Sequence, residues 1–342
     1  MNSERLEFIE NMPKVELHLH LEGAIPLIAL KELVQKYDYK NPLSVDDLIK
    51  KFRYKDFPSF LETWGWKNSF LREYEDFRFI ASEVARDLAD QNIVYVEAFY
   101  SPGSFSQYGL EPQRLTEAIR EGLNKYSSDI TVNLVADLIR DHGPDKGRIY
   151  LEQIVEVRNE GVIGIGIGGS EHEYPPAPYK EVYKRARNLG FHTSAHAGEA
   201  AGADSIWGAI KELDVERIGH GTRAFEDKDL IEYLIKTGLP LEMCPLSNVR
   251  TSIIPDLESH PIRSYFDKGL IVSINSDDPK MFQTSMNEEY YSLMQRLNFS
   301  IGEIKQLAIN AIDTAWCNKT KKADLREELD RYYADCYVPF YS

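Results

Sequence analysis

The chain has 342 residues, of which 43% are hydrophobic, and this is enough to bury the core of one large domain or of two ordinary ones. Its 40 basic and 55 acidic residues give a formal net charge of −15, and because no run rich in Lys or Arg offers a path for a phosphate backbone, nucleic acid is excluded as a partner. No apolar stretch approaches about 18 residues, so we expect no membrane span, and the acidic side chains among the first residues argue against a secretory signal. The three cysteines lack CxxC spacing, so we expect no thiolate zinc site. Together these features favour a cytoplasmic protein.

Short, largely apolar runs recur along the chain and predict buried strands. These runs lie at Val15–His20, Ile93–Phe99, Thr131–Asp137, Ile163–Gly168, His192–His196, Arg217–His220, Pro240–Met243 and Leu270–Asn275. Amphipathic segments that predict helices lie between them, at Gln113–Lys125, Ile149–Asn159, Pro178–Leu189, Ser205–Leu213 and Asp227–Lys236. Eightfold alternation of strand and helix favours a parallel (β/α)8 TIM barrel over an open sheet, and we expect residues 1–342 to form one domain.

A barrel of this kind needs about 250 residues, and most of the surplus lies between the first two strands. That insertion predicts four helices, at Pro26–Tyr37, Val45–Phe52, Phe57–Leu71 and Tyr74–Gln91. Its aromatic residues Phe57, Phe60 and Trp64 are interpreted either as ordinary helix packing or as a lid over a pocket. The segment Ile301–Tyr332 predicts closing helices.

The first strand ends in the string VELHLHLEG (15–23), in which His18 and His20 lie two residues apart. Residues i and i+2 of a strand face the same side, so both imidazoles can face the barrel interior and bind one metal ion. A pair of core or surface histidines is the alternative for this pattern taken alone. Glu22 follows at once and adds a carboxylate beside the pair.

The fifth and sixth strands also end in histidine. His196 lies in TSAHAGE (193–199), where Gly198 allows a tight turn that can bring Glu199 to the metal as a general acid or base; a glutamate at a helix N-terminus is the alternative. His220 lies between two glycines in RIGHGTR (217–223) and is interpreted as a metal ligand, as a base that orients the attacking water, or as a structural histidine.

Asp277 and Asp278 follow the last strand in VSINSDDP (272–279). The side chains of adjacent residues diverge, so one carboxylate can bind the metal while the other meets the substrate. Imidazole and carboxylate ligands suit zinc, and a catalytic site keeps one position open for water. All these residues stand at the carboxyl ends of predicted strands, where a barrel carries its active site.

Two other patterns in the sequence do not predict a catalytic or cofactor site. Residues 164–169 match GxGxxG, but the prolines in the following SEHEYPPAP exclude the helix that a dinucleotide site needs, so we interpret these glycines as a place where a ligand approaches the backbone closely. Four further histidines lack a matching context and are predicted to be structural or surface residues: His142, His172, His192 and His260.

Together, the strings MPKVELHLHLEG, HAGE, RIGHG, CPLSN and SINSDDP resemble the adenosine deaminase family of metal-dependent barrels, over about Met12 to Leu325. The resemblance implies a (β/α)8 fold and hydrolytic removal of the 6-amino group of a purine nucleoside or base, with release of ammonia. It implies one zinc ion per chain, held by His18, His20, His196 and Asp277.

The same resemblance implies the roles of the remaining residues. Glu199 would protonate purine N1, and His220 would orient the attacking water and stabilise its charge. The residues implied to contact the substrate are His20, Glu22, Gly169 (a backbone donor to N3) and Asp278 (a partner of N7).

Substrate identity turns on a few positions. At the position of Glu22, many adenosine-specific members have an Asp that contacts the ribose 5′-hydroxyl. The adenine-specific branch shares this Glu with the present chain, together with the strings IGGSE and CPLSN. That branch usually has Asp at the position of Gly219, however, and DDPKMFQTSMNEEY is closer to nucleoside-acting members. We therefore expect adenosine first, a 5′-modified adenosine such as 5′-deoxyadenosine or aminodeoxyfutalosine second, and free adenine third.

Two rival functions remain. An amidohydrolase that opens a ring C–N bond often bridges two metals with a carbamylated lysine, but the strands VNLVAD and IGIGIGG contain no Lys. A nucleoside-binding relative without activity would be expected to lose a metal ligand or Glu199, and none is missing.

Overall fold

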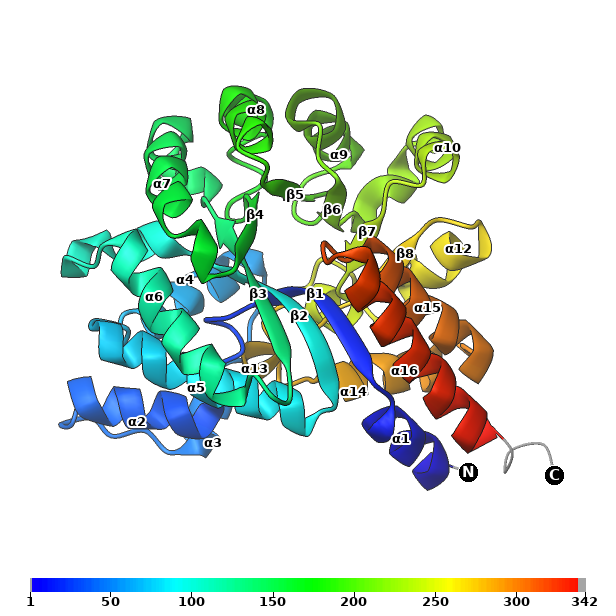
Figure 1. Ribbon diagram of the computed structural model, residues 1–342, viewed down its shortest axis with the longest axis horizontal. Helices are drawn as coiled ribbons and strands as arrows, with labels where there is room; N and C mark the ends of the chain where they lie inside the picture. Colours follow the sequence, from blue (N-terminus) through cyan, green and yellow to red (C-terminus); the bar gives the residue numbers. More distant parts are fainter. Residues whose placement is uncertain (1, 338–342) are drawn as a thin grey trace.

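Eight parallel strands form a nearly closed barrel in the computed structural model, which describes residues 2–337 (Figure 1). The strands are β1 (Lys14–His20), β2 (Ile93–Tyr100), β3 (Thr131–Asp137), β4 (Val162–Gly166), β5 (His192–Ala197), β6 (Arg217–His220), β7 (Leu241–Met243) and β8 (Val272–Ile274). Their order in the sheet follows the chain, and every neighbouring pair is parallel. The predicted TIM barrel is confirmed, with strand bounds within three residues of those expected.

The barrel closes between β8 and β1 through the segment that follows β8. Leu19 and Asp277 form an isolated parallel bridge. The backbone N–H of Asp277 donates to the carbonyl of His18 at 3.1 Å, and the N–H of His20 donates to the carbonyl of Asp277 at 2.8 Å. The closing hydrogen bonds therefore hold Asp277 beside the two histidines of β1.

Helices cover the outside of the barrel, and in Figure 1 those that follow β3, β4, β5 and β6 form an arc along the top. In chain order the covering helices are α6 (Pro112–Leu123), α7 (Pro144–Glu156), α8 (Lys180–Asn188), α9 (Ala203–Gly208), α10 (Lys228–Thr237), α12 (Ile262–Asp267) and α15 (Ile301–Thr314). Each of the longer ones buries one apolar stripe; α6, for example, buries Leu115, Ala118 and Ile119. The helix predicted at Ser205–Leu213 ends as a π-helical turn over Ala209–Leu213.

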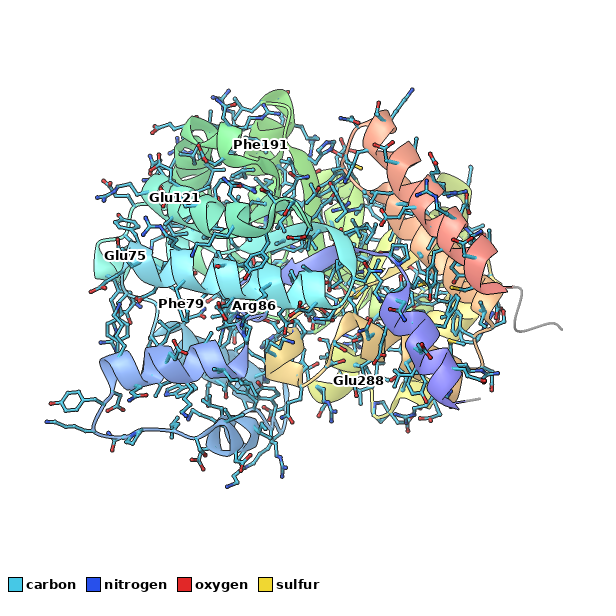
Figure 2. All side chains as sticks on the ribbon, turned by 60° about the horizontal axis from the view of Figure 1, so that its bottom comes forward. Glu75, Phe79, Arg86, Glu121, Phe191 and Glu288 are labelled. Carbon is cyan, nitrogen blue, oxygen red and sulfur yellow. The ribbon has the colours of Figure 1, made fainter. Side chains whose placement is uncertain are left out.

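The predicted insertion forms four helices: α2 (Leu27–Tyr37), α3 (Val45–Lys51), α4 (Phe57–Asn68) and α5 (Tyr74–Asp90). Ser44 and Asp56 start α3 and α4 with capping boxes, which satisfy backbone N–H groups of the first turn. Figure 2 shows α5, marked by Glu75 and Arg86, alongside α6, marked by Glu121. The two helices approach closely, because a Cβ on Gly122 of α6 would lie 2.3 Å from the backbone oxygen of Arg78.

Five helices complete the fold: α1 (Asn2–Asn11), α11 (Pro245–Arg250), α13 (Pro279–Phe282), α14 (Met286–Arg296) and α16 (Lys319–Tyr337). The segment Ile301–Tyr332 does form closing helices, as predicted. α16 packs beside α1, where the Tyr332 hydroxyl donates to the carbonyl of Phe8 at 2.6 Å (Figure 1). Among the helices of residues 2–337, none combines the length and apolar character needed to span a bilayer.

Candidate active site

Four predicted metal ligands meet at the carboxyl ends of β1, β5 and β8. His18 and His20 come from β1, His196 from β5, and Asp277 follows β8. The Nε2 atom of His196 lies 3.0 Å from Nε2 of His18 and 3.1 Å from Nε2 of His20. Oδ1 of Asp277 lies 3.4 Å from Nε2 of His20 and 3.7 Å from Nε2 of His18.

This donor set fits a zinc ion. Zinc bonds nitrogen and oxygen donors at about 2.0–2.1 Å, and a tetrahedral arrangement then separates the donors by ~3.3 Å. The spacings of 3.0 to 3.7 Å lie around that value. Burial lowers the pKa values of His20 and His196 well below the usual range, and a neutral imidazole is the form that binds metal.

His18 is oriented by a buried chain of charges that runs down the barrel interior. Its Nδ1 donates to Oε2 of Glu242 on β7 at 2.7 Å, which leaves the Nε2 lone pair free for a metal. Glu242 pairs with Arg217 of β6 at 2.5 Å, and Arg217 pairs with Glu97 of β2 at 2.6 Å. The Arg217 guanidinium also lies 3.4 Å from the centre of the Trp316 ring.

Asp277 is oriented by Ser247, which belongs to the CPLSN string and lies on α11. The Ser247 hydroxyl donates to Oδ2 of Asp277 at 2.6 Å, so that Oδ1 is the oxygen that faces the histidines. Asp277 and His220 both have left-handed backbones, with φ of 64° and 61°. Such a conformation costs a non-glycine residue about 1–3 kcal/mol, and strain of this kind gathers at functional sites.

Glu199 lies on the loop after β5, and a second carboxylate holds that loop in place. Glu171 accepts four consecutive backbone N–H groups at 2.6 to 3.0 Å, those of Gly198, Glu199, Ala200 and Ala201. The position of Glu199 is therefore fixed through its own backbone. Glu171 belongs to the string IGGSE, but sequence reasoning assigned it no role.

The surroundings of the buried Glu199 carboxyl favour its protonated form. Burial raises its pKa well above the usual range, and the negative charges of Asp277 and Glu171 raise it further. Its Oε2 lies 3.6 Å from Nε2 of His220, which in turn lies 4.0 Å from Oδ2 of Asp277. The site thus places a buried carboxyl and an imidazole within reach of the same small space.

Asp278 packs against Gly23, the glycine of HLHLEG. A Cβ at Gly23 would lie 1.7 Å from Oδ1 of Asp278, so only glycine leaves room for this carboxyl. Oδ1 is buried and has no hydrogen-bond partner within residues 2–337. Burial, and after it the charge of Asp277, raises the pKa of Asp278 well above its usual range.

A cavity of about 350 Å³ opens from this centre towards the insertion. Its inner wall includes six of the site residues: His20, His196, Glu199, His220, Asp277 and Asp278. The outer wall includes Phe57, Phe60 and Trp64 of α4, together with residues of the 3-10 helix η1 (Pro102–Tyr108). The insertion aromatics therefore line the pocket, and they also pack on neighbouring rings, as Phe60 does on Phe282; a role as a lid stays a prediction.

The glycine-rich end of β4 forms another part of the cavity wall. Gly169 has φ of +101°, and a Cβ there would lie 2.1 Å from Oδ2 of Asp141. A Cβ on Gly168 would lie 2.8 Å from Oδ2 of Asp137, and the other carboxylate oxygen, Oδ1, accepts the Gly168 N–H at 2.8 Å. Side chains are excluded at both positions, so the backbone itself faces the cavity.

Glu22 lies behind this wall and is not among the residues that line the cavity within the described chain. Its Oε1 accepts the N–H of Ser101 at 2.9 Å, and Ser101 does line the cavity. Lys67 of α4 is fully buried, donates to the Glu22 carbonyl and lies 4.1 Å from the Trp64 ring. Burial lowers the pKa of Lys67 to about 7. Sequence reasoning did not identify Lys67.

Known proteins similar to this chain are deaminases. A family model described as adenosine deaminase matches residues 13–332. An adenine deaminase of Wolinella succinogenes is 34% identical over 93% of this chain and 97% of its own length. An aminodeoxyfutalosine deaminase of Streptomyces avermitilis is 32% identical over 97% and 94%, and an adenosine deaminase of Edwardsiella ictaluri is 33% identical over 92% and 97%.

Solved structures match in fold as well. The adenine deaminase of Arthrobacter aurescens has a TM-score of 0.90 at 29% identity, covering 94% of this chain and 99% of its own. An amidohydrolase of Burkholderia ambifaria with bound zinc has a TM-score of 0.89 at 27% identity, covering 99% and 96%.

Proposed function

The chain belongs to the adenosine deaminase family, and we propose that it hydrolyses the 6-amino group of adenosine to give inosine and ammonia. As a member of that family it is a hydrolase of amidine C–N bonds that acts on adenine- or adenosine-type substrates. The observation that carries the proposal is the buried carboxyl of Glu199, whose pKa is raised, in one cavity with three members of the candidate metal cluster, His20, His196 and Asp277.

We propose one zinc ion as the cofactor, held by His18, His20, His196 and Asp277. Zinc in such a site supplies a nucleophile at neutral pH by lowering the pKa of water to about 7. A relative crystallised with bound zinc supports this choice of metal. Glu242, Arg217 and Ser247 would keep the ligands in place before the metal arrives.

The remaining residues would bind and protonate the purine. Glu199, whose pKa is raised by burial, would donate a proton to N1, which makes C6 more susceptible to attack by water. The unpartnered oxygen of Asp278 would meet N7, and the backbone at Gly169 would meet N3. Three contacts around the ring would place C6 at the metal cluster.

The cavity favours a neutral nucleoside. Its outer wall adds aromatic, hydroxyl and amide groups, including Trp64, Ser104 and Gln107, where a substituent on purine N9 can lie. No Lys or Arg lines it within the described residues, so a nucleotide phosphate would lack a partner.

At Gly219, a Cβ would lie 2.8 Å from Cε1 of His18, so this chain does not accommodate the Asp usual in the adenine branch.

The test is release of ammonia by metal-analysed protein from adenosine, 5′-deoxyadenosine, a 5′-thioether adenosine, AMP and adenine in parallel. We expect adenosine to give the highest kcat/KM, and AMP to react poorly because its phosphate meets only acidic and neutral groups. A preference for a 5′-modified nucleoside would move the assignment to the second expected substrate class, to which the relative of Streptomyces avermitilis belongs by name. Reaction with adenine alone would overturn the nucleoside proposal, and zinc-loaded protein without any of these activities would overturn deamination.

A further inference from the structure

A line of hydrogen bonds lies behind His220, on the side away from the cavity. The backbone N–H of Ile262 lies 3.3 Å from Nδ1 of His260. Nε2 of His260 lies 3.2 Å from Oδ1 of Asn248, and Nδ2 of Asn248 lies 3.4 Å from Nδ1 of His220. The side chains of Asn248, His220 and His260 are all buried. Neither Asn248 nor His260 lines the cavity.

The direction of every bond in this line follows from its first member. A backbone N–H can only donate, so Nδ1 of His260 accepts and carries no hydrogen. Burial lowers the pKa of His260 to about 3, so the neutral ring must carry its single hydrogen on Nε2. That N–H donates, and the Asn248 atom that faces it is therefore the carbonyl oxygen, Oδ1.

The orientation of the Asn248 amide then determines whether Nδ1 of His220 donates or accepts. With Oδ1 towards His260, the NH2 group faces His220, whose Nδ1 must accept. Thr222 contributes a hydroxyl 2.7 Å from Oδ1, but a hydroxyl can donate or accept, so His260 sets the direction. A neutral His220 then carries its hydrogen on Nε2, which has no partner within residues 2–337 and lies 3.6 Å from Glu199.

We propose that Asn248 and His260 are positioning residues that hold His220 in its Nε2–H tautomer. The role of this tautomer rests on the proposed deamination: His220 presents a hydrogen-bond donor to the oxygen that attacks C6, and stabilises negative charge there. In the other tautomer, His220 would present a lone pair to that oxygen and would compete with Glu199 for protons.

The first test needs no substrate. In zinc-loaded protein labelled with 15N-histidine, long-range 1H–15N spectra show which ring nitrogen carries hydrogen, and a His220→Gln variant assigns the signal by removing it. We expect His220 to be protonated on Nε2 and bare on Nδ1. A His220 protonated on Nδ1 overturns the proposal, whatever the enzyme's substrate proves to be.

The second test reverses the polarity of the line. In Asn248→Asp a carboxylate of the same shape can only accept, so Nδ1 of His220 should become protonated. Holding a catalytic imidazole in the wrong tautomer costs ~10⁴-fold in kcat in serine proteases, and we expect a loss of ~10²–10⁴-fold here with KM and zinc content little changed. A normal kcat and an unchanged His220 spectrum, even with a lower melting temperature, would show a merely structural role and overturn the proposal.

A matched pair of substitutions at His260 distinguishes the effect of hydrogen-bond direction from the effect of side-chain packing. His260→Gln keeps an N–H donor towards Oδ1 of Asn248 and should keep the Nε2–H tautomer and most of kcat. His260→Leu removes the donor, so the Asn248 amide can turn over; we expect mixed tautomers and a kcat about 10-fold lower, the equivalent of one hydrogen bond. Equal spectra and rates in the two variants would contradict the proposal, and the pair remains informative if Asn248→Asp does not fold.

Discussion

Several polar side chains in the interior of this barrel either hold another polar side chain in place, as Glu242 and Ser247 do, or line the cavity. The site residues on the inner wall of the cavity could be predicted from the sequence, because they stand at strand ends in recognisable strings. The residues behind them could not. Glu242, which orients His18, lies 224 positions away in the chain, and in the sequence it is a single acidic residue within an apolar strand. Asn248 belongs to the CPLSN string, but the sequence assigned it no role, and the prediction of His260 as a structural or surface residue missed its contact with Asn248.

The Glu199→Gln substitution tests the proposed general acid. The amide keeps the shape of the buried carboxyl but has no proton to deliver to N1, so we expect kcat to fall by ~10²–10⁴-fold with zinc content unchanged. Glu232→Gln, a change at an exposed position of α10, is the matched control and should keep full activity. A Glu199→Gln enzyme as fast as the unsubstituted one would rule out this role.

The Glu242→Gln substitution tests how the protein prepares His18. An amide oxygen is a weaker acceptor for the His18 Nδ1–H than a carboxylate, and we expect the Kd for zinc to rise by about 10–100-fold in a competition titration with a chelator. Glu97→Gln is the control, because Glu97 also pairs with Arg217 but does not touch His18. Equal losses of zinc affinity in both variants would mean that the ion pairs, and not the contact with His18, set the affinity.

At the level of elements, the strands and the longer helices follow directly from hydrophobic periodicity, since each strand is an apolar run and each covering helix has one apolar stripe. The short helices α11 and α13 were not predicted. Both begin at prolines, Pro245 and Pro279, and are too short to show a period. The sequence also did not predict that α4 lies over the mouth of the barrel, because helix packing and pocket lining require the same aromatic residues.

A Trp64→Ala substitution tests the contribution of α4 to binding. The indole forms part of the cavity wall, so we expect its loss to raise KM for adenosine by ~10-fold, while kcat changes less because no reacting atom is touched. Trp66→Ala on the same helix is the control; Trp66 packs against Phe70 and does not line the cavity, so its KM should stay unchanged. The same KM in both variants would argue against binding by Trp64.

At the level of the whole molecule, the site is assembled by closure of the barrel. The bridge between Leu19 and Asp277 brings together residues from the two ends of the fold, which local patterns do not predict but a parallel barrel requires. Substrate identity is harder to predict, because the outer cavity wall comes from α4 and η1, whose residues carry no motif. Relatives of 32–34% identity bear three different substrate names, which agrees with a common centre and a variable outer wall.

The most direct test of the account is a zinc titration of metal-free protein, with deamination of adenosine followed at each addition. A single site made by His18, His20, His196 and Asp277 predicts no activity without metal, and a rate that rises linearly and stops at one zinc per chain. Activity in the metal-free protein, or a rate that continues to rise up to two zinc ions per chain, would contradict it.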